Sequence, residues 1–153
     1  MIRTLPTASS ALWLRWVLVI GWMILIFSLS HMNGSDSANG SFFLVEILIW
    51  LGIDPAVMPL EMLSFLVRKS AHFTEYLLLA IFALPLFSHY LGKHRAYWLA
   101  AWFFCVAYAA SDEWHQTFVP GREGKWTDVL IDGAGAALGL WLIKRRRFND
   151  SQE

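Results

Sequence analysis

This chain has a single cysteine and few charged residues, and its formal net charge is zero. Its 153 residues include a single cysteine, Cys105, which excludes an intramolecular disulfide framework and a metal site made of several thiolates. We interpret Cys105 as a small apolar residue inside a helix. Twelve Lys and Arg balance twelve Asp and Glu, and this formal net charge of zero excludes a strongly basic nucleic-acid binder. Charged residues make up 16% of the chain, against about 25% in soluble proteins.

Apolar and aromatic residues take the place of the missing charges. Hydrophobic residues make up 57% of the chain and aromatic residues 16%, with nine Trp and eleven Phe. Soluble globular chains hold roughly 45 to 50% apolar residues, and a domain of this length has too small an interior to bury the excess. The composition therefore predicts one domain, residues 1–153, that lies in a membrane.

Stretches without Asp, Glu, Lys or Arg indicate where the chain crosses the membrane. The longest has 20 residues, between Arg15 and Asp36, and a membrane-spanning helix needs about 20. Three further stretches of 17, 16 and 11 residues reach that length only if polar residues at one end enter the membrane. We predict an all-α bundle of four transmembrane helices, at about residues 12–31, 69–89, 96–117 and 126–143.

The first predicted helix has an alternative interpretation as a cleaved signal peptide. Arg3 and Arg15 precede its apolar run, and residues 38–40 (Ala-Asn-Gly) form an acceptable cleavage site. The run over residues 16–30 is long and carries bulky Trp and Phe, as a membrane anchor does, so we favour the anchor. The intact mass of the purified protein distinguishes the two.

Lys and Arg predict the orientation of the helices, because they are enriched on the cytoplasmic side of membranes. If the four helices alternate in direction, four basic residues lie on one side: Arg68, Lys69, Arg122 and Lys125. Eight lie on the other: Arg3, Arg15, Lys93, Arg95, Lys144, Arg145, Arg146 and Arg147. We therefore predict a multi-pass protein of the bacterial inner (cytoplasmic) membrane with both termini in the cytoplasm. All acidic residues except Asp150 and Glu153 then belong to the outer half.

The first outer connection is predicted to hold a short helix. Residues 31–41 (HMNGSDSANGS) have the composition of a linker with turns. The segment that follows, to about residue 52, is apolar except for one Glu and is too short to span a membrane. We predict an interfacial or re-entrant helix at about 42–52, with Pro59 as a first-turn residue of the next helix.

Three of the predicted spans carry polar residues. Burying a charged side chain at mid-membrane costs roughly 2.5 to 3.5 kcal/mol, so such residues indicate function. Spacings of three and four residues place them on one face of each helix. The sets are Lys69, His72, Glu75 and Tyr76; then Asp112, Glu113, His115 and Gln116; then Asp128 and Asp132. All three sets lie at the outer ends of their helices, so we expect them to meet in one pocket near the outer leaflet.

The alternative is that these residues are ordinary helix ends that reach water. We favour that interpretation for Arg68, Glu123 and Lys125. We favour function for Glu75 and Asp132, because each lies about a turn or more inside an apolar run.

Glycines mark two further features. Residues 119–124 (VPGREG) predict a tight turn that places Arg122 at the mouth of the pocket. There a guanidinium can hold a phosphate or carboxylate, or neutralise the nearby acids.

Gly135 and Gly139 form a small face on the last helix that lets another helix approach closely, and we predict internal packing rather than dimerisation.

Two segments carry an ordered series of motifs. Residues 69–80 (KSAHFTEYLLLA) and 112–139 (DEWHQTFVPGREGKWTDVLIDGAGAALG) contain, in order, K-x-x-H-x-x-E-Y, D-E-x-x-Q, P-G-R and D-x-x-x-D. In these motifs the chain resembles the VanZ-like family of small bacterial membrane proteins. The resemblance implies ten functional positions: Lys69, His72, Glu75, Tyr76, Asp112, Glu113, Gln116, Arg122, Asp128 and Asp132. Many family members have Asn at the last position, where Asp132 adds a carboxylate.

The resemblance implies a membrane function without a settled reaction. The family takes its name from a protein linked to resistance to the glycopeptide teicoplanin, and a lipid-modifying activity has been proposed for such proteins. We therefore expect an outward-facing intramembrane enzyme whose partner is a membrane lipid or a lipid-linked cell-envelope precursor. The expected catalytic residues are His72, Glu75, Asp112 and Glu113. The expected substrate-binding residues are Lys69, Tyr76, Gln116, Arg122, Asp128 and Asp132.

Two alternatives remain open. The same residues suit a non-enzymatic membrane binding protein, or a small transporter that would have to be a homo-oligomer, because four helices are few for a transport path. A metal site is the other, because His72-x-x-Glu75 and Asp112-x-x-His115 each place a His and a carboxylate on one helical face. We expect no metal and no cofactor, since Lys69 would repel a cation.

Overall fold

Five α-helices make up the described part of the chain, residues 8–92 and 96–149, in the computed structural model. They are α1 (Ala8–His31), α2 (Gly34–Trp50), α3 (Leu60–Leu91), α4 (Ala96–Gln116) and α5 (Trp126–Asn149). No strand occurs within these residues. The predicted all-α fold is therefore confirmed.

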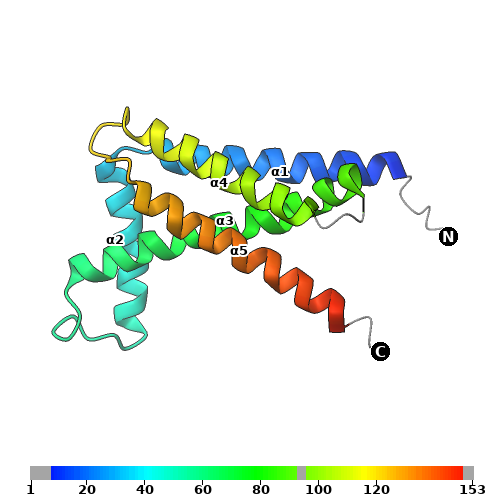
Figure 1. Cartoon of the computed structure of the whole chain (residues 1–153). Coiled ribbons are helices and arrows are strands. Elements are labelled where there is room, and N and C mark those ends of the chain that lie inside the picture. Colours follow the sequence, from blue (N-terminus) through cyan, green and yellow to red (C-terminus); the bar gives the residue numbers. More distant parts are fainter. Residues whose placement is uncertain (1–7, 93–95, 150–153) are drawn as a thin grey trace, which may run out of the picture.

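Helix α3 is the centre of the arrangement, because it packs against each of the other four helices. In Figure 1, α1 and α4 run toward the end of the molecule at which α2 lies, whereas α3 and α5 run away from it. Helix α2 runs across the other helices at this end, which we call the α2 end. The beginning of α1 and the end of α5 both lie at the opposite end. The four long helices thus alternate in direction along the chain.

Three helices of the described ranges are long and apolar enough to cross a membrane. The segments are Leu12–His31 in α1, Leu60–Leu91 in α3 and Trp126–Arg146 in α5. Helix α4 has sufficient length, with 21 residues, but it is less apolar. It is rich in Ala, Tyr and Trp, and Asp112 and Glu113 lie near its end. Three of the four predicted spans therefore meet both requirements.

Two details of the first outer connection differ from the prediction. Residues 31–41 were expected to form a linker with turns, but the chain is helical from Gly34, so α2 is longer than the predicted helix at 42–52. Ser41 is buried and α2 packs on α3, which indicates that tertiary packing outweighs the turn propensity of Gly, Ser and Asn. Pro59 lies at the N-cap of α3 rather than in its first turn, because its ψ of 144° is extended.

Apolar side chains are divided between a narrow core and a large outer surface. The core lies among α1, α3, α4 and α5, and its fully buried members include Ile26, Leu79 and Cys105. Cys105 is thus an apolar core residue, as predicted. On α1, by contrast, Trp13 and Ile24 keep 68% and 60% of their surface exposed. An apolar exterior of this extent suits lipid as the surrounding solvent.

Two glycines of α5 allow its backbone to approach α3 closely. A Cβ atom on Gly135 would overlap the carbonyl oxygen of Phe73, and one on Gly139 would overlap that of Leu77. Both neighbours belong to α3, four residues apart, so the predicted small face packs inside the protomer. This contact sets the register in which the polar residues of α3 and α5 meet.

Candidate functional site

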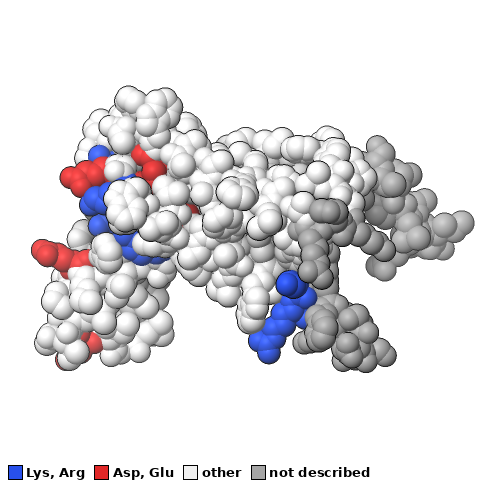
Figure 2. Space-filling model, in the orientation of Figure 1, with Lys and Arg blue, Asp and Glu red and all other residues white. Residues whose placement is uncertain are grey.

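The polar residues of three helices gather at the α2 end. Figure 2 shows Lys, Arg, Asp and Glu together at this end, a second group of basic residues at the far end of α5, and a white surface between them. The basic group at the far end includes Lys144, Arg145 and Arg146. The polar sets of α3, α4 and α5 are therefore neighbours in space, although they come from segments far apart in the sequence.

Two pairs of side chains join α3 to α5. Lys69 forms an ion pair with Asp128, and both side chains are largely buried. One turn further along, His72 Nδ1 lies 3.7 Å from Asp132 Oδ1. Asp132 is completely buried, and neither of its oxygens has a hydrogen-bond partner among the described residues. Burial of the Asp132 carboxyl group is energetically unfavourable, because a buried polar group without a hydrogen-bond partner loses its hydration.

Asp112 joins α4 to α1. Its Oδ2 accepts a hydrogen bond of 2.6 Å from Ser30 Oγ and one of 3.1 Å from Gln116 Nε2. Its Oδ1 is buried and has no hydrogen-bond partner in the part of the chain that the structure describes, and the residue as a whole is 3% exposed. Ser30 was not among the predicted site residues. Its only signal in the sequence is a hydroxyl near the end of an apolar run.

Glu113 joins α4 to the turn that precedes α5. Its Oε2 accepts a hydrogen bond of 2.8 Å from the backbone N–H of Lys125. Its Oε1 lies 3.4 Å from Gln116 Nε2. Gly124 is required beside it, because a Cβ there would overlap the carbonyl oxygen of Glu113. The turn and the end of α4 therefore position each other.

Arg122 ties the same turn to the end of α1. Its Nε donates to the carbonyl of Met32 and its Nη2 to the carbonyl of Leu29, both at 3.0 Å, and its Nη1 donates to Gln116 Oε1 at 3.4 Å. The last carbonyls of a helix lack partners within the helix, so the guanidinium satisfies groups that would otherwise need water. Partial burial lowers the pKa of Arg122 from its ordinary value, and the carboxylate of Asp112 opposes that shift.

Two cavities meet at this cluster. The first, of about 380 Å³, has walls that include Arg68, Lys69, His72, Arg122, Lys125 and Asp128. The second, of about 300 Å³, has walls that include Leu29, Met32, Leu44, Val67 and Glu75. Arg68, His72 and Arg122 line both. A basic cavity and a mostly apolar cavity thus share three polar side chains.

The apolar cavity continues toward a groove between α2 and α3. This groove, of about 600 Å³, shares Leu44, Val67 and Ala71 with the apolar cavity. Its other walls are mostly apolar and come from both helices, Leu48 and Leu66 among them. The basic cavity, the apolar cavity and the groove therefore follow one another at the α2 end, and their walls change from basic to apolar in that order.

Several predicted site residues lie elsewhere than expected. Tyr76, expected to bind substrate, is completely buried in the core against Tyr108, with its hydroxyl unpaired among the described residues. Arg68, expected only to reach water, is exposed but lines both cavities. His115 lies apart from the cluster, where its Nε2 is 3.2 Å from His31 Nδ1. Among the described residues His115 contacts His31 and Phe27, and it is not one of the residues whose donor atoms converge with those of Asp112.

The exposed pair in the turn agrees with the prediction. Glu123 and Lys125 form an ion pair of 3.0 Å with side chains 80% and 56% exposed. An ion pair this open to water contributes little to stability. Both residues thus reach water, as expected.

The apolar helices and the polar cluster at one end define the chain as a helical membrane protein. More narrowly, the chain belongs to the VanZ/LLP1 family, whose model matches residues 15–147. The match spans all four sequence motifs and confirms the resemblance that they indicated. No curated protein and no solved structure matches the chain.

Proposed function

We propose that the protein crosses the bacterial inner membrane four times, through α1, α3, α4 and α5, with both termini in the cytoplasm. The alternating helix directions support this topology, as do the basic residues at the end of α5 opposite the α2 end. Arg3, Lys93, Arg95, Asp150 and Glu153, which also entered the orientation prediction, lie outside the described residues. Helix α2 then lies at the outer surface of the membrane.

The topology is tested with reporters fused to the C-terminus. A reporter that works only in the cytoplasm should be active there, and a periplasmic reporter should be silent. If α4 did not cross the membrane, three spans would place the termini on opposite sides. A C-terminal reporter active only outside, with the N-terminus shown to be cytoplasmic, would therefore reject the four-span topology.

The function that the site supports best is binding and modification of an anionic lipid or lipid-linked cell-envelope precursor. The observation that carries this proposal is the junction of the basic cavity with the apolar cavity at Arg68, His72 and Arg122. A lipid with a phosphate-containing head group has a matching structure, because its anionic head is joined to an apolar part. Its head would lie among guanidinium and ammonium groups, and its apolar part would continue along the groove between α2 and α3.

His72 and Glu75 are the residues best placed for proton transfer. They lie one turn apart on α3, and both line the apolar cavity. In this proposal Glu75 takes the proton of a hydroxyl that attacks the phosphorus of the head group, and His72 gives a proton to the oxygen that leaves, so that one P–O bond forms and another breaks. Asp112 and Glu113 are buried carboxylates of the same cluster. Asp112 accepts hydrogen bonds from Ser30 and Gln116, and Glu113 accepts one from a backbone N–H of the turn before α5.

The activity is tested by mass spectrometry of envelope lipids. A strain without the gene receives the wild-type gene, Glu75→Gln, His72→Ala or the control Glu61→Gln, which alters an exposed carboxylate in the first turn of α3. We expect a mass-shifted lipid with the wild-type gene and the control, and not with the two site variants. The same strains test the relation to teicoplanin by their drug susceptibility. A shifted lipid in both site variants would refute the proposed acid and base.

A second candidate function is a lipid-binding protein without chemistry. The observation that favours it is how fully Lys69, Asp128 and Arg122 are engaged with protein groups. In that case the lipid profiles of the deletion strain and its parent would be equal. Lipid bound to the purified wild-type protein would then separate a binder from a protein with no lipid ligand.

A further inference from the structure

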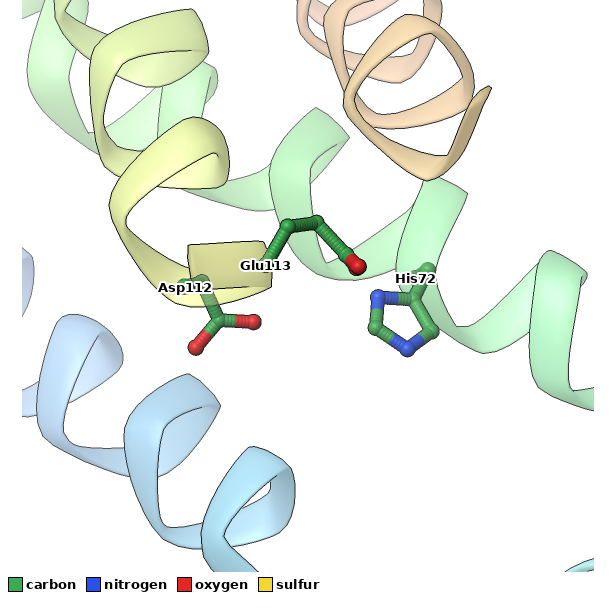
Figure 3. A group of neighbouring side chains, drawn as sticks. All are labelled: His72, Asp112 and Glu113. Atoms are coloured by element: carbon green, nitrogen blue, oxygen red, sulfur yellow. The ribbon is translucent and has the colours of Figure 1, made fainter. Parts of the chain in front are cut away.

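A histidine and two carboxylates converge where α3 meets the end of α4. His72, Asp112 and Glu113 each offer one donor atom, and these atoms lie within 4.8 Å of one another. Figure 3 shows the Glu113 side chain reaching toward the His72 ring, and Asp112 beside it with one oxygen on the His72 side and one on the α1 side. Asp112 and Glu113 are buried, and His72 is half-buried.

Each carboxylate of this group has one oxygen engaged and one available. Asp112 Oδ2 is held by Ser30 and Gln116, and Glu113 Oε2 is held by the N–H of Lys125. Within residues 8–92 and 96–149, Asp112 Oδ1 has no hydrogen-bond partner and Glu113 Oε1 has only the long contact to Gln116. Metal-binding carboxylates are commonly oriented by such hydrogen bonds to the oxygen that does not bind the metal.

The charges of the buried groups leave an excess of acid. Lys69 is paired with Asp128, which removes the ammonium as an obstacle to a second cation. The remaining buried carboxylates are Asp112, Glu113 and Asp132, and the nearby Arg122 guanidinium is directed to backbone carbonyls of α1 and to Gln116. Asp112 Oδ1 is buried without a hydrogen-bond partner among the described residues, and Asp132 lies against the His72 ring. A divalent cation would give Asp112 Oδ1 a partner and balance the charge of Asp112 and Glu113, while Asp132 would orient the ring of His72.

We propose that His72, Asp112 and Glu113 bind a divalent first-row transition-metal ion, such as Zn²⁺ or Mn²⁺. An imidazole with two carboxylates favours these ions over Mg²⁺ and Ca²⁺, which prefer oxygen ligands alone. Tetrahedral zinc ligands lie about 3.3 Å apart, so the donors must close by about 1.5 Å at most, which side-chain rotation supplies. Three protein ligands leave a position open to water or substrate. The site goes beyond the proposed lipid function: in the metal-bound protein His72 would be a ligand instead of a proton donor, and lipid binding in the cavities would not depend on it.

The test measures metal binding to the purified full-length protein in detergent. Elemental analysis after expression with added Zn²⁺ or Mn²⁺ should give close to one ion per chain, and either ion should raise the melting temperature more than Mg²⁺ does. The variants Asp112→Asn and Glu113→Gln keep the shape of each side chain and remove a ligand charge. We expect each to weaken binding at least about tenfold.

Controls separate this site from metal bound at the surface. Glu61→Gln removes an exposed carboxylate, and His31→Ala removes one member of the exposed His31–His115 pair, which itself offers two imidazoles. Both controls should bind metal as the wild-type protein does. The proposal is overturned if the protein holds no metal and is not stabilised by it. It is equally overturned if His31→Ala abolishes binding while Asp112→Asn retains it.

Discussion

The close contact of α5 with α3 predicts that Gly135→Ala destabilises the protein. The added Cβ would overlap the Phe73 carbonyl oxygen and lie 3.0 Å from the carbonyl carbon, so α5 must move outward. A gap of about 0.5 to 1 Å loses roughly a quarter to a half of each local dispersion contact. Inserting a methyl group into packed structure typically costs about 1 to 3 kcal/mol. Alanine returns about 1 kcal/mol of helix propensity, which leaves a net loss of up to about 2 kcal/mol.

The matched control is Gly21→Ala in α1. No atom lies within 4 Å of the position its Cβ would occupy, so only the gain in helix propensity applies. The gain in helix propensity is the same in both variants, so their free energies of unfolding should differ by the steric cost alone, about 1 to 3 kcal/mol. Denaturation by SDS, followed through the fluorescence of the nine tryptophans, measures this difference. Equal stability of the two variants would refute the close α3–α5 approach.

Three further changes test the contacts around the site. Ser30→Ala should lower stability by about 1.5 to 3 kcal/mol, because Asp112 loses a charged hydrogen bond, and thermal denaturation measures it. Lys69→Met should cost roughly 3 kcal/mol by leaving Asp128 unpaired, and Lys69→Met with Asp128→Leu should recover most of that loss; no recovery would show that the pair has other partners. Arg122→Lys should lower the melting temperature, because lysine keeps the charge but cannot reach both carbonyls of α1; an unchanged value would mean that charge alone matters.

The long helices were predictable from their stretches without charged residues, although three of these reach spanning length only when polar residues at one end are added. Predicted spans at 96–117 and 126–143 begin where α4 and α5 begin, and the span at 12–31 ends where α1 ends. Helix α2 was predicted only in its apolar half, because the Gly, Ser and Asn residues before it favour turns locally. Its contact with α3 is a tertiary effect that periodicity does not contain.

The sequence predicted which helix faces carry the polar residues of the site, but not which residues of different helices contact one another. Spacings of three and four put His72 and Asp112 on the polar faces of their helices, and the helix ends brought these faces together. They did not show which residues of α1 the polar residues of α4 meet: Asp112 accepts a hydrogen bond from Ser30, and His115 lies beside His31. Which neighbour a helix face meets depends on helix rotation and register, and here the α5 glycines set the register.

The groove between α2 and α3 has a consequence for how a ligand arrives. In the proposed topology the groove lies at the α2 end, at the level of the outer leaflet, so lipid in that leaflet would enter it sideways by two-dimensional diffusion, without first leaving the bilayer. Occupancy would then follow the mole fraction of that lipid in the leaflet rather than its concentration in water. Dilution with inert lipid at constant protein concentration would empty the site, whereas dilution with buffer would not.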